Sequence, residues 1–234
     1  MSPTTSPVYG LRKNPTLVDF PGRMAVVFFT TGCNFECGFC HNATLLGKQC
    51  EGYGWERLRH VCERFRNQWV DGAVITGGEP TLSSNLGELV TFLRDQGFSV
   101  KLDTNGSRPD VLAPLLPLLE YVAMDVKCSL PSYEDFVAFP DTEAIVQSVA
   151  LLRAEAKDYE FRTTVLTDFH SDEEMHGIGD IVRPARRFVV QPFIPRDDLP
   201  SAKWCREPRT SPDRLKAVSE LMKVYADEVV VRGA

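Results

Sequence analysis

The chain has 234 residues, of which 43% are hydrophobic and 25% charged, and its net charge is −6. This length suffices for one sizeable core, and we expect residues 1–234 to form a single domain. The acidic balance argues against a generally basic nucleic-acid-binding protein. No stretch approaches the roughly 20 apolar residues that a membrane span needs. The polar N-terminus lacks the apolar segment of a secretory signal, so we expect a cytoplasmic protein with no membrane partner.

Apolar runs that suit strands alternate along the chain with segments of helical periodicity. Strands are expected at residues 24–30, 73–75, 99–103, 121–126, 160–166, 188–191 and 228–231. Helices are expected between them at residues 55–69, 86–96, 109–119, 142–157, 172–182 and 212–225. This alternation predicts an α/β fold built from βαβ units around a mainly parallel sheet.

The chemically suggestive motifs all follow expected strands. In a parallel α/β fold, ligands gather at the carboxyl ends of the strands. The sequence therefore predicts a single active site at that edge. Residues 192–211, rich in Pro, Arg and Asp, are the longest irregular segment and are expected at the surface, where such loops often contact partners or substrates.

Three of the seven cysteines crowd into the loop at residues 31–42, directly after the first expected strand. In a reducing compartment, such crowding indicates metal binding rather than disulfides. The spacing of Cys33, Cys37 and Cys40 lets one loop hold an iron–sulfur cluster through three thiolates, leaving one of its four irons open. A structural zinc site is the alternative, with Cys50 or His41 as the fourth ligand, although neither lies in a second paired motif.

The other cysteines do not share this pattern. Cys62 on a helix and Cys128 after a strand are expected to be packing residues. Cys50 and Cys205 are left open, with an auxiliary cluster as the alternative to a packing role.

The arrangement C-x3-C-x2-C, with Phe39 before the last cysteine, resembles the signature of the radical S-adenosylmethionine (SAM) superfamily. The resemblance implies a [4Fe–4S] cluster on Cys33, Cys37 and Cys40, and SAM bound at the open iron. Reductive cleavage of SAM would give a 5′-deoxyadenosyl radical that removes a hydrogen atom from the substrate. It also implies a partial (β/α)6 TIM-like barrel.

The segment Thr76-Gly-Gly-Glu-Pro80 ends the second expected strand. By itself it could be a plain turn. Its position after Cys40 resembles the superfamily motif that holds the SAM amine, which implies cofactor contacts for Gly77, Gly78 and Glu79.

An aspartate ends each of the next two expected strands, which is costly unless the carboxylate is paired or binds a cation. In the simplest interpretation, Asp103 and Asp125 cap turns or helices and Lys127 neutralises one of them. The segments 103–106 and 125–127 also resemble the glycyl-radical-enzyme activating branch. That resemblance implies a monovalent cation beside the SAM carboxylate, held by Asp103, Thr104, the Ala123 carbonyl and Asp125.

The same resemblance implies further contacts to the cofactor. It assigns Lys127 to the catalytic site, and Asn42 and Asn105 to the cofactor pocket. Arg162 matches an arginine near the cofactor carboxylate, a role that suits a bidentate guanidinium. Some relatives have a histidine near the ribose, where this chain offers only Gln191 as a candidate.

Three segments indicate to which branch of the radical SAM superfamily the chain is similar. They are Cys-His-Asn at 40–42 and the segments 17–22 and 228–233. Together they resemble anaerobic ribonucleoside-triphosphate reductase activating proteins. The implied partners are a glycyl-radical enzyme as protein substrate and a flavodoxin or ferredoxin as electron donor. The segment between Cys40 and Gly77 is too short for the ferredoxin-like insert of some activases, so one cluster is predicted.

Two other functions stay open. A radical SAM enzyme of similar length could act on a small molecule, as 7-carboxy-7-deazaguanine synthase does, although His41-Asn42 favours the activase. A non-enzymatic zinc- or cluster-binding module would bind no SAM.

Overall fold

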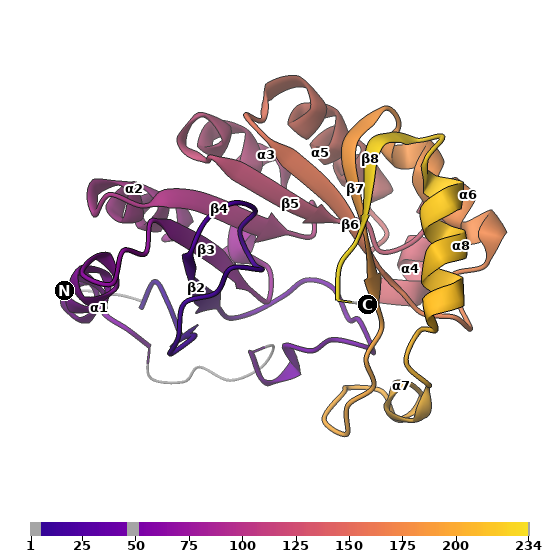
Figure 1. The fold of residues 1–234 in the computed structure, drawn as a ribbon, viewed down its shortest axis with the longest axis horizontal. Helices are drawn as coiled ribbons and strands as arrows, with labels where there is room; N and C mark the ends of the chain where they lie inside the picture. The colour runs from indigo at the N-terminus through magenta and orange to yellow at the C-terminus, as the bar shows by residue number, and fades with distance from the viewer. Residues whose placement is uncertain (1–5, 46–51, 234) are drawn as a thin grey trace.

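The computed structural model describes residues 6–45 and 52–233, in which eight strands form one sheet (Figure 1). The strands are β1 (Gly10–Leu11), β2 (Ala25–Thr30), β3 (Gly72–Gly77), β4 (Ser99–Thr104), β5 (Tyr121–Asp125), β6 (Tyr159–Val165), β7 (Ala185–Pro192) and β8 (Ala226–Val231). They lie in chain order, with β1 antiparallel to β2 and all later neighbours parallel. Because β1 and β8 form the two edges, the curved sheet is an open barrel. The predicted parallel α/β fold with a partial barrel is confirmed.

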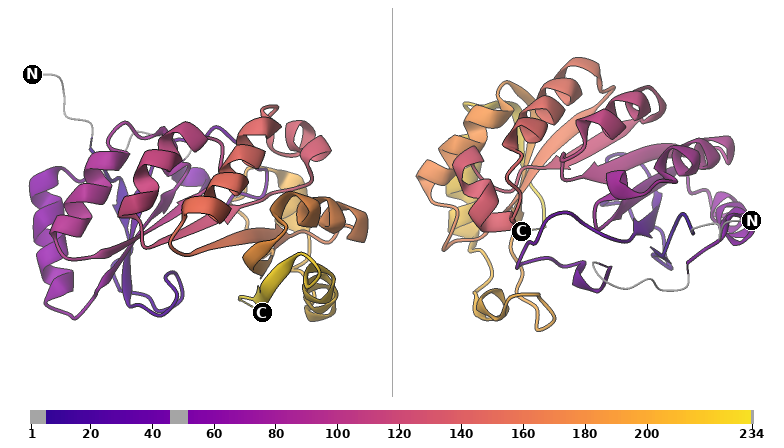
Figure 2. Two further views of the ribbon diagram at one scale, coloured as in Figure 1. Left: turned by 90° about the horizontal axis from the view of Figure 1, so that it is seen from above. Right: turned by 180° about the vertical axis from the view of Figure 1, so that it is seen from behind.

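Helices connect successive parallel strands and cover the outer face of the sheet (Figure 2). They are α1 (Trp55–Arg66), α2 (Leu86–Asp95), α3 (Pro109–Leu112), α4 (Tyr133–Val137), α5 (Thr142–Glu155), α6 (Asp172–Val182), α7 (Ala202–Arg206) and α8 (Pro212–Met222). No helix in the described ranges is both long and apolar enough to cross a membrane.

Each longer helix turns an apolar stripe toward the sheet. In α1 the buried side chains are Leu58, Cys62 and Phe65, at the spacing of one helix face. Cys62 and Cys128 are both 0% exposed, which confirms the predicted packing role. Together these stripes form the main core on the outer side of the sheet.

A second, smaller core lies on the inner face. Phe20 packs there against Val27 of β2, Val74 of β3 and Tyr121 of β5. The segment before β2 therefore covers part of the barrel interior. The charged and sulfur-bearing residues described below lie at the carboxyl ends of the strands, which this inner core does not cover.

The segment 109–119 differs from the predicted single helix. It forms α3 and then a 3₁₀ helix at Ala113–Leu118. Pro114 and Pro117 lack the backbone N–H groups that an α-helix would need at those positions. The change of helix type follows directly from the two prolines.

The segment 192–211, predicted to be an irregular surface loop, contains the short helix α7 and packs against the cysteine loop. The Ser201 N–H donates to the Gly38 carbonyl at 3.0 Å. A Cβ at Gly38 would lie 2.9 Å from Ser201 Cβ and from Trp204 Cδ1. Most of the segment is irregular and much of it is exposed, as predicted. The prediction missed α7 and its contacts, because these contacts join residues that are far apart in sequence.

Candidate active site

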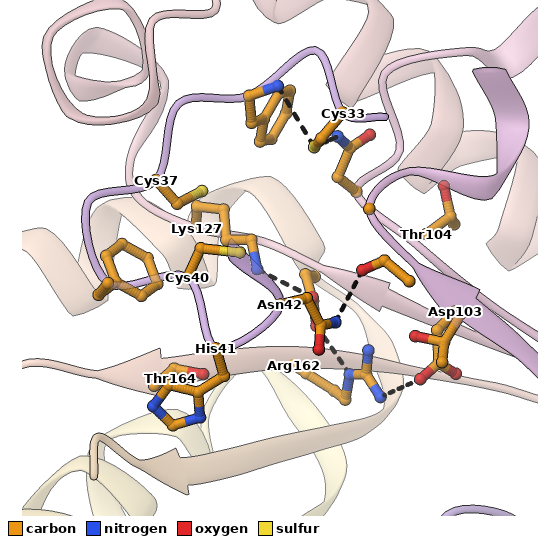
Figure 3. Close-up of a pocket in the computed structure, with 17 residues that line it drawn as sticks. Cys33, Cys37, Cys40, His41, Asn42, Asp103, Thr104, Lys127, Arg162 and Thr164 are labelled. Atoms are coloured by element: carbon orange, nitrogen blue, oxygen red, sulfur yellow. Dashed lines mark hydrogen bonds and ion pairs between the residues drawn. The ribbon is translucent and has the colours of Figure 1, made fainter. Parts of the chain in front are cut away.

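One pocket gathers the ends of β2 to β6 and the cysteine loop (Figure 3). Thirteen of the residues predicted for the site line it, and they come from five separate segments. They are Cys33, Cys37, Phe39, Cys40, Asn42, Gly77, Gly78, Asp103, Thr104, Asn105, Asp125, Lys127 and Arg162. The expectation that the motifs meet at one edge of the sheet therefore agrees with the geometry.

Four further residues line the same pocket and were not predicted for it: Phe35, His41, Thr76 and Thr164. A sequence signal existed for Thr164, because it lies two residues after Arg162 on β6 and so shares its face. His41 donates or accepts through Nε2 at 2.9 Å from the Ile194 carbonyl, a contact that joins the cysteine loop to the segment after β7.

Two predicted cofactor-binding residues do not line the pocket. Gln191 lies on β7 beside Thr164, and it is Thr164 that faces the cavity. Glu79 is 0% exposed, and its carboxylate accepts hydrogen bonds from Thr81, Thr104 and Asn105. Burial raises the pKa of Glu79, and these donors oppose the shift. The Glu79 side chain thus ties the end of β3 to the end of β4 and does not line the pocket.

The two glycines are required by close backbone contact. Gly77 has φ +129°, and a Cβ there would lie 2.2 Å from the Thr30 carbonyl oxygen. A Cβ on Gly78 would lie 1.9 Å from the Gly32 carbonyl oxygen. The Glu79 N–H donates to that same Gly32 oxygen at 2.8 Å. The Gly-Gly turn therefore lies directly against the start of the cysteine loop.

The three loop cysteines line the pocket with unequal exposure. Cys37 is buried, and burial raises the pKa of its thiol to about 12. Burial also raises the pKa of Cys33. Lys127 opposes both shifts through its positive charge. Because metal ligation requires thiolates, iron would displace these protons on binding.

Polar groups surround the Cys33 sulfur. The Phe35 N–H donates to Cys33 Sγ at 3.4 Å, and Asn105 Nδ2 donates to it at 3.9 Å. Asn105 Nδ2 also donates to Asn34 Oδ1 at 3.0 Å. Hydrogen bonds to sulfur orient a cluster ligand and affect its reduction potential. These residues therefore fit an iron–sulfur ligand at Cys33.

The site has no close group of three or more His, Cys, Asp or Glu side chains for a single metal ion, within residues 6–45 and 52–233. A cube needs no such convergence, since each thiolate binds a different iron. Cys205 is half-buried and donates to backbone carbonyls of its own segment, the nearest being Ser201 O at 3.5 Å. Cys50, the other cysteine with an open role, lies outside the described residues.

A network of ion pairs forms the inner wall of the pocket. Arg162 Nη1 lies 3.0 Å from Asp103 Oδ2, and Arg162 Nε lies 2.7 Å from Asp125 Oδ1. Lys127 Nζ lies 2.9 Å from Asp125 Oδ2. Burial alone would raise the pKa of Asp125, but Arg162 and Lys127 hold it well below its usual range. Asp103 and Asp125 are thus both paired with positively charged side chains. The simplest interpretation of the sequence predicted such a pairing, with Lys127, for one of the two.

An aromatic wall closes the side of the pocket next to Cys40. Phe39 stacks on Phe136 with ring centroids 5.3 Å apart, and Phe136 stacks on Phe169 at 3.6 Å. Trp204 of α7 meets the edges of Phe39 and Phe136 at 6.3 and 6.4 Å. Phe39 and Trp204 are both buried, so this wall covers one side of the cysteine loop.

Comparison with known proteins identifies relatives along most of the chain. The sequence model of the radical SAM superfamily matches residues 27–182. A Methanocaldococcus jannaschii protein named "Putative glycyl-radical enzyme activating enzyme" is 30% identical over 223 residues, covering 92% of this chain and 91% of that protein. The 7-carboxy-7-deazaguanine synthase of Neisseria meningitidis serogroup B is 34% identical over 114 residues, covering 48% of this chain and 49% of that enzyme.

Among solved structures, Streptococcus suis SuiB bound to its precursor peptide SuiA superposes with a TM-score of 0.67 at 14% identity. The match covers 89% of this chain and 48% of SuiB. At this identity the likeness concerns the fold alone.

Proposed function

The chain belongs to the radical SAM superfamily, and we propose that it is an activating enzyme that generates a glycyl radical on a partner enzyme. The observation that carries the proposal is similarity over nearly the whole chain to a protein named as such an activating enzyme. The similarity to 7-carboxy-7-deazaguanine synthase covers about half of each chain. The expected single domain and single cluster are part of the proposal.

The residues of the pocket fit the two cofactors of this superfamily. Cys33, Cys37 and Cys40 would hold three irons of a [4Fe–4S] cluster, next to a cavity that could receive SAM. When bound, the reduced cluster supplies the electron that cleaves SAM to methionine and a 5′-deoxyadenosyl radical. The protein itself binds the cofactors, orients SAM and excludes water from the pocket.

Two groups of residues would orient SAM. Arg162 and Lys127 present positive charge to the cavity, which suits the SAM carboxylate. The backbone of Gly77 and Gly78 lines the cavity without side chains, which suits the SAM amine. The Asn42 side chain donates to the Gly77 carbonyl at 2.7 Å and so fixes this turn against the cysteine loop.

The radical would remove an α-hydrogen atom from a glycine of the partner, giving 5′-deoxyadenosine and a glycyl radical. An open barrel suits this step, because a loop of a protein substrate can enter from the side. The electron would come from a flavodoxin or ferredoxin. The aromatic wall of Phe39, Phe136 and Trp204 would keep water from one side of the reacting centre.

The test starts with anaerobic reconstitution with iron and sulfide, reduction, and addition of SAM together with each glycyl-radical enzyme of the host. We expect 5′-deoxyadenosine and the electron paramagnetic resonance doublet of a glycyl radical on one partner. Cys37→Ala should give neither. Formation of 5′-deoxyadenosine with no radical on any of these enzymes would refute the activase role.

The second candidate is a small-molecule reaction, favoured by the partial match to 7-carboxy-7-deazaguanine synthase. The same reduced enzyme would be assayed for 7-carboxy-7-deazaguanine by mass spectrometry. Its appearance would replace the activase proposal.

A further inference from the structure

Every carboxylate oxygen of Asp103 and Asp125 already faces a positively charged group. Asp103 contacts Lys101 through Oδ1 and Arg162 through Oδ2. Asp125 contacts Arg162 through Oδ1 and Lys127 through Oδ2. These are charge-assisted hydrogen bonds, which are stronger than neutral ones.

Lys101 is the least expected member of this network. Its side chain is 1% exposed, and it lies on β4 two residues before Asp103, so both side chains share the inner face. A buried lysine is costly unless its charge is paired. Burial lowers the pKa of Lys101, and the Asp103 carboxylate opposes that shift.

Asp103 is the carboxylate available to Lys101. Glu160 also acts on Lys101 electrostatically. However, Arg232 binds both Glu160 oxygens at 2.7 and 2.8 Å, and the Tyr121 hydroxyl donates to Glu160 at 2.8 Å. Lys101 does not line the pocket, so its ammonium group acts on the cavity through Asp103.

The net charge around Asp103 and Asp125 is unfavourable for binding an additional monovalent cation. Lys101, Arg162 and Lys127 face two carboxylates, which leaves one positive charge in excess. A cofactor carboxylate would cancel that excess, whereas an alkali cation would double it. The Thr104 hydroxyl, another expected ligand, donates to Glu79 at 2.8 Å. The residues present therefore do not fit the cation that the family resemblance implied.

We infer that the Lys101 ammonium group takes the place of the monovalent cation, so that the SAM site works without an alkali ion. Lys101 is a positioning residue: its contact fixes the Asp103 carboxylate, and Asp103 in turn orients Arg162 toward the cavity. The inference rests on the radical SAM chemistry of the proposed function and not on the identity of the substrate.

The first test uses the wild-type holoenzyme in chloride salts of potassium, sodium or N-methyl-D-glucamine at equal ionic strength. SAM affinity is measured by isothermal titration calorimetry, and bound alkali ion is probed by ²⁰⁵Tl nuclear magnetic resonance with thallous ion. We expect SAM affinities that agree within about twofold in the three salts and no thallium bound at the site. An affinity at least about tenfold lower in N-methyl-D-glucamine, or a bound thallium ion displaced by potassium, would overturn the inference.

The second test uses Lys101→Met, whose unbranched side chain is one heavy atom shorter and carries no charge. We expect SAM affinity to fall by about tenfold in N-methyl-D-glucamine and to recover in potassium. Lys216→Met, at an exposed position of α8, is the matched control and should behave as the wild type. Full SAM affinity of Lys101→Met in all three salts would contradict the inference.

If Lys101→Met does not fold, the salt comparison of the wild type still decides. The proposed function and the proposed role of Lys101 can also be refuted independently of each other. SAM bound equally in all salts but never cleaved would remove the proposed function and leave the role of Lys101 intact.

Discussion

His170 should make the folded protein sensitive to mild acid. Its imidazole is 0% exposed; Nδ1 accepts from the Leu166 N–H at 2.9 Å, and Nε2 lies 2.9 Å from the Lys127 carbonyl oxygen. These contacts require a neutral ring with its proton on Nε2. Burial lowers the pKa of His170 from 6.5 to about 4. The residue therefore anchors the backbone of Lys127, beside the ion pairs of the pocket.

The sign of the effect follows from proton linkage. Because the pKa is lower in the folded chain, the unfolded chain binds this proton more readily, and acid favours unfolding. The stabilisation is complete above the unfolded pKa of 6.5 and is lost as the pH falls toward about 4. The linkage relation gives a full loss of about 3 kcal/mol, of which about 2 kcal/mol is lost by about pH 5.

The assay is urea unfolding of anaerobically prepared, cluster-free protein at several pH values between about 5 and about 8. His170→Gln retains a donor toward the Lys127 carbonyl but does not titrate. The difference between wild type and this variant therefore isolates the contribution of His170. His60→Gln is the control, because the His60 side chain is 70% exposed. The reasoning is refuted if His170→Gln loses as much unfolding free energy as the wild type over this pH range.

Three further changes test the pocket. Gly78→Ala would place a Cβ 1.9 Å from the Gly32 carbonyl oxygen, so SAM affinity in calorimetry should fall at least about tenfold. Gly87→Ala, where the nearest atom would be 3.8 Å away, should keep that affinity and raise the unfolding free energy by about 0.5 kcal/mol. Arg162→Lys cannot bridge both aspartates, and we expect about tenfold weaker SAM binding in the same assay. Cys205→Ala should retain the iron content of the wild type; a loss of iron would indicate an auxiliary cluster.

Local sequence patterns predicted much of the fold. The apolar stripe of α1 and the alternation of strands and helices gave the parallel sheet, because periodicity depends on near neighbours in the chain. The segment 109–119 was mispredicted although its signal, Pro114 and Pro117, is local and present in the sequence. The helix α7 was missed for a different reason, since its packing partners lie in the distant cysteine loop.

The sequence by itself determined the spacing of the three thiols in one loop, because that spacing is a property of a short segment. The need for glycine at positions 77 and 78 comes from their contacts with Thr30 and Gly32 in the folded chain. The tertiary structure decided what the polar side chains do. Glu79 was assigned to the cofactor but bonds to Asn105, 26 residues later, and Arg162 joins Asp103 across 59 residues. Such pairings depend on which strands lie side by side, so only the folded sheet reveals them.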